Sequence, residues 1–211
     1  MEKISKIFFK LSLLILLILP ISCDSNQVIQ NNDSNKTESK VLKIGSANSK
    51  ITIKVFSSLT CPHCANFHIN IFEELRKEYI DKGIVKFEHH SFPLDLAALN
   101  AEIIVRCHLD IIKSFQLLGE IYKKQSQWAI GSDINIINES IKKIGLDSGL
   151  KNSKMNECLK DENLQEEILN ERIEAQKKYK IESTPTIYIN EKQYKDKHEY
   201  IQFKKAIEKL L

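Results

Sequence analysis

Two hydrophobic periodicities alternate along the chain, one typical of buried strands and one typical of amphipathic helices. The apolar run 51–56 predicts a strand, and a second strand is predicted over residues 84–90. Between them, apolar residues at steps of three and four predict a helix that reaches to about Ile80. This order predicts a right-handed β-α-β unit with parallel strands. The apolar face of the predicted helix consists of Cys64, Phe67, His68, Ile71, Phe72, Leu75 and Tyr79.

The middle of the chain has the helical periodicity alone. Between about residues 95 and 175 the pattern predicts a succession of helices and no strand. One helix is expected to begin after Asp133, whose side chain suits an N-cap, and to end at Gly145.

The strand periodicity returns near the C-terminus. Residues 186–189 predict a strand, residues 190–193 a hairpin turn and Tyr194 the start of a partner strand, and an amphipathic helix closes the chain. The chain is therefore expected to be an α/β protein with an inserted all-helical subdomain. The frame is assigned to residues 41–94 and 175–211, and the insertion to residues 95–174.

The first 22 residues carry an export pattern. Three lysines precede an apolar run over residues 11–19, which is shorter than the roughly 20 residues that a membrane-spanning helix needs. Residues 1–22 are therefore expected to be a signal peptide, and the mature chain to work in the periplasm or cell envelope, where cysteine pairs form disulfides. Their removal lowers the formal net charge from +3 to +1, which gives no electrostatic case for nucleic-acid binding.

Cys23 begins a polar segment over residues 23–40, whose composition is typical of a flexible linker. Cys23 follows the apolar run and the small Ser22, as in the lipobox of bacterial lipoproteins, but Leu19 lies four residues before it instead of three. Two interpretations stay open: a lipid anchor on Cys23, with Asp24 favouring the inner membrane, and ordinary cleavage that leaves a soluble protein. The sequence favours the anchor because a free thiol in an exported protein otherwise has no use.

The central chemical signal is Cys61-Pro62-His63-Cys64 at the predicted helix start. A thiolate is stabilised at a helix N-terminus, and Pro62 suits the first turn, where no N–H is needed. His63 can lower the pKa of Cys61 further, and a stabilised thiolate makes the disulfide form more oxidising. Cys64 lies one turn later on the buried face. We expect Cys61 to attack and Cys64 to resolve the mixed disulfide.

Two other interpretations of the thiol pair were weighed. Cys61 and Cys64 could be half of a zinc site with His63 or His68, but no second ligand pair at suitable spacing follows, so no metal is predicted. A purely structural Cys61–Cys64 bond would close too small a loop to stabilise much. His68 falls on the apolar helical face and is expected to be a core residue.

Thr184-Pro185 stands directly before the last predicted strand. Such a dipeptide is compatible with a cis peptide bond and equally with a simple turn.

The combination of these features resembles the DsbA-like thiol:disulfide oxidoreductases of bacterial envelopes, which have a thioredoxin fold. The resemblance covers about residues 41–211 and includes Cys61-Pro62-His63-Cys64 and Thr184-Pro185. It implies that Pro185 is cis beside the thiols and that the Thr184 backbone pairs with a bound substrate strand. Some relatives carry a buried acid where Val55 stands here, so proton handling is expected to fall to water or another residue, such as Glu88.

Cys107 and Cys158 both lie on apolar stripes of the helical block. They could be independent buried thiols or a metal pair, but in an exported protein we expect a structural disulfide. Closing a loop of about 50 residues would contribute about 3–4 kcal/mol. The bond is ruled out if the two Cα atoms lie more than about 7 Å apart.

The predicted function is oxidation of exported, cysteine-containing proteins by the Cys61–Cys64 disulfide. The resemblance also implies a membrane-embedded partner that reoxidises the pair; no cofactor is expected, and the chain is expected to be a monomer. A disulfide reductase or isomerase of the same fold is the alternative, and an exported metal-binding protein is the alternative from another class. Isomerases of this superfamily dimerise through an added N-terminal domain, for which residues 24–40 are too short.

Overall fold

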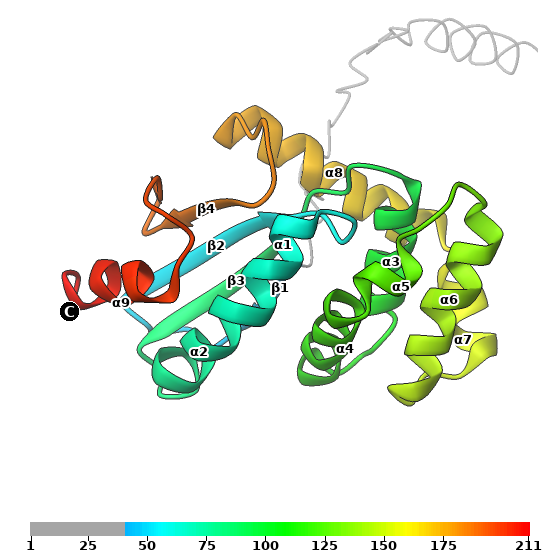
Figure 1. The fold of residues 1–211 in the computed structure, drawn as a ribbon, viewed down its shortest axis with the longest axis horizontal. Coiled ribbons are helices and arrows are strands. Elements are labelled where there is room, and N and C mark those ends of the chain that lie inside the picture. The colour runs from blue at the N-terminus through cyan, green and yellow to red at the C-terminus, as the bar shows by residue number, and fades with distance from the viewer. Residues whose placement is uncertain (1–40) are drawn as a thin grey trace, which may run out of the picture. The chain divides into compact units, whose positions relative to one another are not determined.

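The computed structural model describes residues 41–211, so the predicted signal peptide, the linker and Cys23 lie outside the described residues. A five-stranded mixed sheet with the strand order β1-β3-β2-β4-β5 forms the centre of this part of the chain (Figure 1). Strands β2 and β3 are parallel and the other neighbours are antiparallel. The strands are β1 Leu42–Ile44, β2 Ile51–Ser57, β3 Val85–Ser91, β4 Thr186–Ile189 and β5 Lys192–Gln193.

One long helical run connects β2 to β3, as the sequence predicts. It begins with α1 (Pro62–Phe67) and contains α2 (Glu73–Leu75), each followed by a five-residue π-helical segment. The π-helical segments are His68–Phe72 and Arg76–Ile80. The sequence periodicity does not distinguish these wider turns from α-helix, because both leave the same face apolar.

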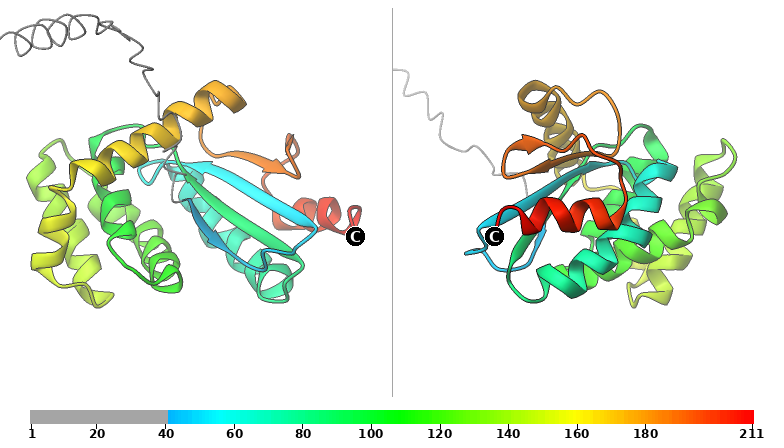
Figure 2. Two further views of the ribbon diagram at one scale, coloured as in Figure 1. Left: turned by 180° about the vertical axis from the view of Figure 1, so that it is seen from behind. Right: turned by 60° about the vertical axis from the view of Figure 1, so that its left-hand side comes forward.

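The sheet has two different faces. Alternate residues of β2 and β3, such as Val55 and Phe87, point towards the helical run and the main core. There Phe87 contacts Phe72 and Phe115, with ring centroids 4.6 and 6.2 Å apart. The opposite face carries Lys54 and Glu88, and near one end it packs against α8, which crosses this side of the sheet in Figure 2.

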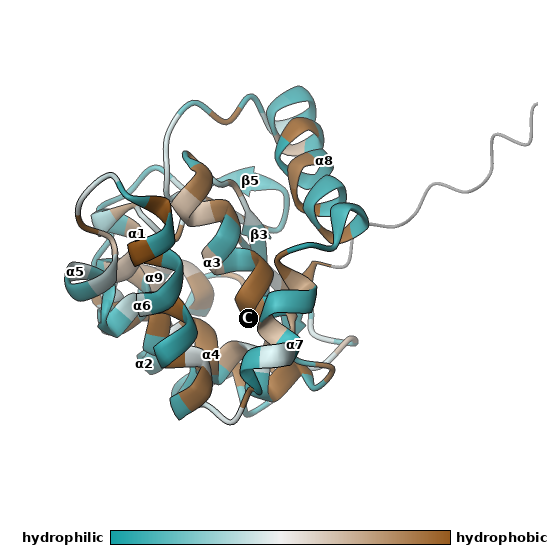
Figure 3. Cartoon of the chain, turned by 90° about the vertical axis from the view of Figure 1, so that its right-hand side faces the viewer, coloured by the Kyte–Doolittle hydropathy of each residue, from teal (hydrophilic) through white to brown (hydrophobic). Residues whose placement is uncertain are grey.

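The helical insertion between β3 and β4 is confirmed, and it contains one short helix that the periodicity did not predict. Its helices are α3 Leu96–Arg106, α4 Ile111–Lys123, α5 Gln125–Trp128, α6 Ile134–Asp147, α7 Asn152–Cys158 and α8 Glu162–Tyr179. Four residues are too few to reveal a period, so α5 is invisible in the sequence. Figure 3 shows α8 as mostly hydrophilic with a few hydrophobic positions, in agreement with its few buried residues.

The prediction that a helix ends at Gly145 is wrong. Asp133 caps α6 as predicted, by accepting a hydrogen bond of 2.9 Å from the Asn135 N–H, but α6 continues through Gly145 to Asp147. A Cβ atom at position 145 would collide with the Met155 sulfur of α7. Gly145 therefore allows two helices to approach closely, and it does not terminate one.

The C-terminal hairpin is tighter than predicted. The turn between β4 and β5 uses Asn190 and Glu191 alone, both with positive φ, and the partner strand begins at Lys192. Two residues with positive φ suit the twist of a hairpin better than the four-residue turn expected over residues 190–193. The chain closes with α9 (Tyr200–Glu208), which packs on the main core through Phe203 and Ile207.

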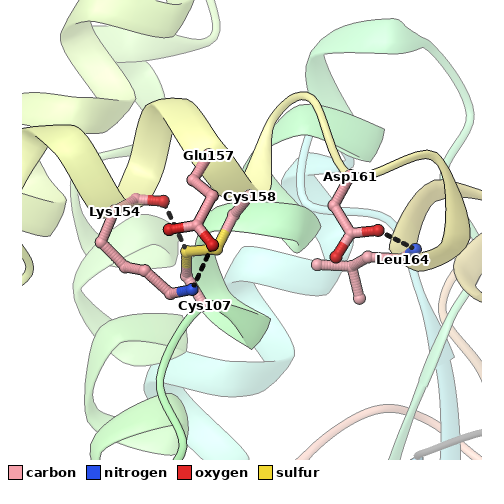
Figure 4. Close-up of a disulfide and its surroundings, with 6 residues drawn as sticks. All are labelled: Cys107, Lys154, Glu157, Cys158, Asp161 and Leu164. Carbon is pink, nitrogen blue, oxygen red and sulfur yellow. Dashed lines mark hydrogen bonds and ion pairs between the residues drawn. A yellow bond between two sulfur atoms is a disulfide. The ribbon is translucent and has the colours of Figure 1, made fainter.

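Cys107 and Cys158 are joined by a disulfide whose Cα atoms lie 6.1 Å apart. Figure 4 shows this bond connecting the end of α3 to the end of α7, with the ion pair of Lys154 and Glu157 beside it. Both cysteines are buried. Among residues 41–211, no helix combines the length and the apolar character that crossing a bilayer requires.

Candidate active site

Cys61 is the N-cap of α1, where the chain leaves β2 and turns into the long helical run. A short turn places it there, because its N–H donates to the Ser58 carbonyl at 3.1 Å. Its own carbonyl accepts from the Cys64 and Ala65 N–H groups. Pro62 occupies the first helical position, where the missing N–H costs no hydrogen bond. The sulfur thus lies beside the unpaired N–H groups that begin the helix.

Cys61 and Cys64 are both free thiols and lie next to the loop that precedes β4. The Cys61 Sγ is 3.2 Å from the carbonyl oxygen of Thr184, and the Thr184–Pro185 peptide bond is cis. The two motifs that the sequence analysis selected, 123 residues apart, therefore meet at one site. Cys61 is 7% exposed and Cys64 only 1%.

The environment of Cys61 stabilises its thiolate. The hydrogen bond from the Cys64 thiol lowers the Cys61 pKa most, and burial acts in the opposite direction. The Thr184 side chain and the backbone N–H groups of Cys64 and His63 lower it further, so that the pKa falls from 9.0 to about 5. Near neutral pH, Cys61 is therefore ionised and able to attack or to leave as a thiolate.

The Cys64 pKa is shifted in the opposite direction. Burial raises it first, and the Cys61 thiolate raises it further through their hydrogen bond and its charge. Cys64 is therefore protonated at every pH at which Cys61 reacts. The arrangement gives one exposed-side nucleophile and one buried thiol that can reach only its neighbour.

His63 is exposed beside the thiols and contributes its backbone N–H to the Cys61 thiolate. His198, from the segment before α9, lies close by: its ring is 6.5 Å from that of Phe67, one helical turn after His63. Burial and the charge of His63 both lower the His198 pKa. Nothing in the local sequence marks His198, because it approaches the site from the far end of the chain.

Gln125 of the short helix α5 is a second residue that sequence reasoning missed. Its side-chain amide donates to the carbonyls of Leu59 and Cys61, at 2.7 and 3.0 Å. Asp95 holds the same turn from the other side by accepting a 2.7 Å hydrogen bond from the Thr60 hydroxyl. Both partners come from the insertion, so the helical block fixes the loop that carries Cys61.

His68 and Glu88 do not face the thiol pair as ligand or base. His68 is a core residue, stacked on Phe72 and in contact with Tyr122. The expectation that Glu88 handles the proton is wrong, because Glu88 lies on the opposite face of the sheet and binds Lys86 and His90. In the part of the chain that the structure describes, no three His, Cys, Asp or Glu side chains are arranged to hold a metal ion.

The family model described as thioredoxin matches residues 36–209. The chain belongs to the thioredoxin family. Within that family it is a DsbA-like member, since its fold matches a solved structure of this type, alpha-DsbA1 of Wolbachia pipientis. That structure has a TM-score of 0.74 and 26% identity, over 81% of this chain and 90% of the other.

Two sequence relatives are informative. Disulfide bond formation protein D of Bacillus subtilis is 29% identical over 89% of this chain and 86% of its own. A Rickettsia bellii protein, whose name describes a protein-disulfide oxidoreductase, is 31% identical over 74% of this chain. The chain spans 59% of the length of that Rickettsia relative.

Proposed function

We propose that this chain is a thiol:disulfide oxidoreductase of the cell envelope that transfers the Cys61–Cys64 disulfide to exported proteins. The observation that carries the proposal is the opposite shift of the two pKa values, down to about 5 for Cys61 and upward for Cys64. A stabilised Cys61 thiolate favours the reduced protein, which makes its disulfide a strong oxidant. The names of the relatives agree with this chemistry.

The reaction proceeds by two exchanges. A substrate thiolate attacks the Cys61 sulfur, the Cys61–Cys64 bond breaks, and Cys64 leaves with the electron pair. The second substrate thiolate then attacks the substrate sulfur of the mixed disulfide and releases Cys61 as a thiolate. Thr184, whose carbonyl lies 3.2 Å from the Cys61 sulfur, and Pro185 line the place where the substrate chain would bind.

The location and partners belong to the same proposal. Residues 1–22 act as a signal peptide, and residues 23–40 tether the folded part, with Cys23 as the lipid-bearing residue. A membrane-embedded protein with a disulfide of higher potential reoxidises Cys61 and Cys64. The frame of residues 41–94 and 175–211 carries the thiols, and the insertion of residues 95–174 supports the loop through Gln125 and Asp95.

The deciding experiment is an equilibrium titration of the Cys61–Cys64 pair against glutathione redox buffers. We expect a reduction potential nearer to about −120 mV, as in strongly oxidising members, than to about −270 mV, as in thioredoxin. A Cys64→Ala variant is expected to accumulate mixed disulfides on Cys61, whereas Cys61→Ala accumulates none. A potential at the thioredoxin end would reassign the protein as a reductase.

A further inference from the structure

The buried thiol of Cys64 presents a proton problem. Its sulfur is 1% exposed and its pKa is raised by burial and by the Cys61 thiolate. When Cys64 leaves during substrate oxidation it needs a proton, and when it attacks a mixed disulfide on Cys61 it must give one away. An unprotonated thiolate in the core is costly, so a nearby group has to hold that proton.

A buried histidine–carboxylate pair lies on the same face of the sheet as the thiols. The parallel register pairs Val55 with His89, so the His89 side chain points towards the helical run that carries Cys64. The His89 Nε2 is 3.1 Å from a Glu102 carboxylate oxygen, and both side chains are 2% exposed. Burial alone would raise the Glu102 pKa, but the charges of His89 and Arg106 lower it to about 2.

Tyr122 of α4 connects this pair to the thiol electrostatically. Burial raises its pKa most, the charges of Cys64, Glu102 and Cys61 raise it further, and the nearby Ser57 hydroxyl opposes them. Tyr122 therefore lies close to both the thiol and the carboxylate. Its hydroxyl is buried and has no hydrogen-bond partner, which is unusual for a phenol in a core.

The other titratable groups around His89 do not suit the role. The His68 pKa falls to about 3, through burial and then the charge of His89, so His68 stays neutral. Arg106 pairs with Glu102 at 3.0 Å and with Glu171, which keeps both carboxylates ionised. His90 points to the other face, where it binds Glu88 at 3.1 Å and lies 3.6 Å from Glu171.

We propose that the His89–Glu102 pair holds the proton that Cys64 exchanges, and that the Tyr122 hydroxyl passes it between them. This inference rests on the proposed function, because it concerns a step of the same reaction. When substrate thiolate opens the disulfide, the departing Cys64 thiolate takes the proton of the His89 imidazolium, and Glu102 keeps its charge. In the reverse step, neutral His89 takes the Cys64 proton while Cys64 attacks Cys61.

A chromogenic aryl disulfide separates the two thiols of the reduced protein in time. In the first phase, the Cys61 thiolate attacks the reagent and one coloured thiolate is released. In the second phase, Cys64 loses its proton, attacks Cys61 and releases the second coloured thiolate. The first phase reports on Cys61 alone and serves as an internal control for folding and access.

Two variants test the proton path, and one matched variant controls for it. Tyr122→Phe removes a hydroxyl that bonds to nothing, and His89→Gln preserves a hydrogen bond to Glu102 without carrying a proton. Both are expected to slow the second phase at neutral pH about tenfold or more, in line with the loss of a proton-transfer group, and to leave the first phase within about twofold. His90→Gln, the neighbour that faces away, is expected to leave both phases unchanged.

The pH profile separates proton transfer from loose packing. The second phase of His89→Gln should rise in proportion to hydroxide, whereas the wild-type rate should depend less steeply on pH. A second phase unaltered in Tyr122→Phe overturns the proposed path, and this variant decides alone if His89→Gln does not fold. If the glutathione titration gives a reducing potential while the second phase responds as expected, the proposed function fails and the proton path stands.

Discussion

At the scale of single residues, the chemistry depends on how differently one fold treats two identical side chains. Cys61 and Cys64 are three residues apart, yet the Cys61 pKa falls to about 5 while the Cys64 pKa rises. The helix start and Thr184 act on the first sulfur, and burial acts on the second. The oxidising character therefore resides in the neighbours, and replacing a neighbour should change it.

Thr184 offers the most direct test of that statement. Its hydroxyl is buried without a partner in the dithiol structure and stabilises the Cys61 thiolate, while its carbonyl contacts the thiol form. Thr184→Val is expected to raise the Cys61 pKa from about 5 by about one unit, since a hydrogen bond to a charged group is worth about 1.5–3 kcal/mol. The rate of Cys61 alkylation as a function of pH measures this midpoint directly.

Thr186→Val is the matched control for this substitution. Its hydroxyl donates to the Ser183 carbonyl at 2.6 Å and does not contact the sulfur. We expect lower stability and an unchanged alkylation midpoint. Equal midpoints in the wild type and Thr184→Val would contradict the role assigned to the hydroxyl.

The sequence predicts the residues of this site that belong to local motifs and misses those that arrive from elsewhere. Cys61, Cys64 and Thr184-Pro185 each stand at a recognisable junction of strand, turn and helix. Gln125 and His89 have no such local signal. Glu88 was chosen one position away from His89, and neighbouring residues of a strand point to opposite faces, so only the register with β2 decides between them.

At the scale of elements, two helical glycines look alike in sequence but have different surroundings. A Cβ at Gly145 of α6 would collide with the Met155 sulfur, whereas a Cβ at Gly119 of α4 would lie 3.5 Å from the His68 Nε2, an ordinary contact. Gly145→Ala is therefore expected to destabilise the protein by about 1–3 kcal/mol through overpacking. Gly119→Ala should gain about 0.5–1 kcal/mol from helix propensity.

Urea unfolding of both variants measures the difference. Shortening the colliding side chain in a Gly145→Ala/Met155→Ala double variant should make the glycine substitution less costly than it is with Met155 present. A stabilised Gly145→Ala would mean that α6 and α7 separate easily. The sequence could not distinguish these glycines, because a helix-ending glycine and a close-packing glycine leave the same letter in an apolar pattern.

At the scale of the whole described chain, a buried ionic network ties the sheet to the insertion. Arg106, the last residue of α3, contacts Glu102 on its own helix, Glu171 of α8 and the Ser91 hydroxyl of β3. The Ser91 N–H also donates to Glu171 at 2.8 Å. The next residue, Cys107, forms the disulfide with α7, so the two devices that hold the insertion share one helix end.

This proximity leads to a prediction about how the disulfide acts. Removing it in Cys107→Ala/Cys158→Ala frees a loop with a sequence separation of 51 and should lower the unfolding free energy by about 3–4 kcal/mol. The alkylation midpoint of Cys61 should stay near 5, because the groups that set it are Cys64, Thr184 and the start of α1. Denaturant unfolding and alkylation of the same samples test both parts. A shifted midpoint would show that the bond also positions the thiols, through the α3 end and the Asp95 contact to Thr60. An unchanged midpoint with lower stability would leave the disulfide a purely structural device, with the redox chemistry confined to the loop, the helix start and the buried groups behind Cys64.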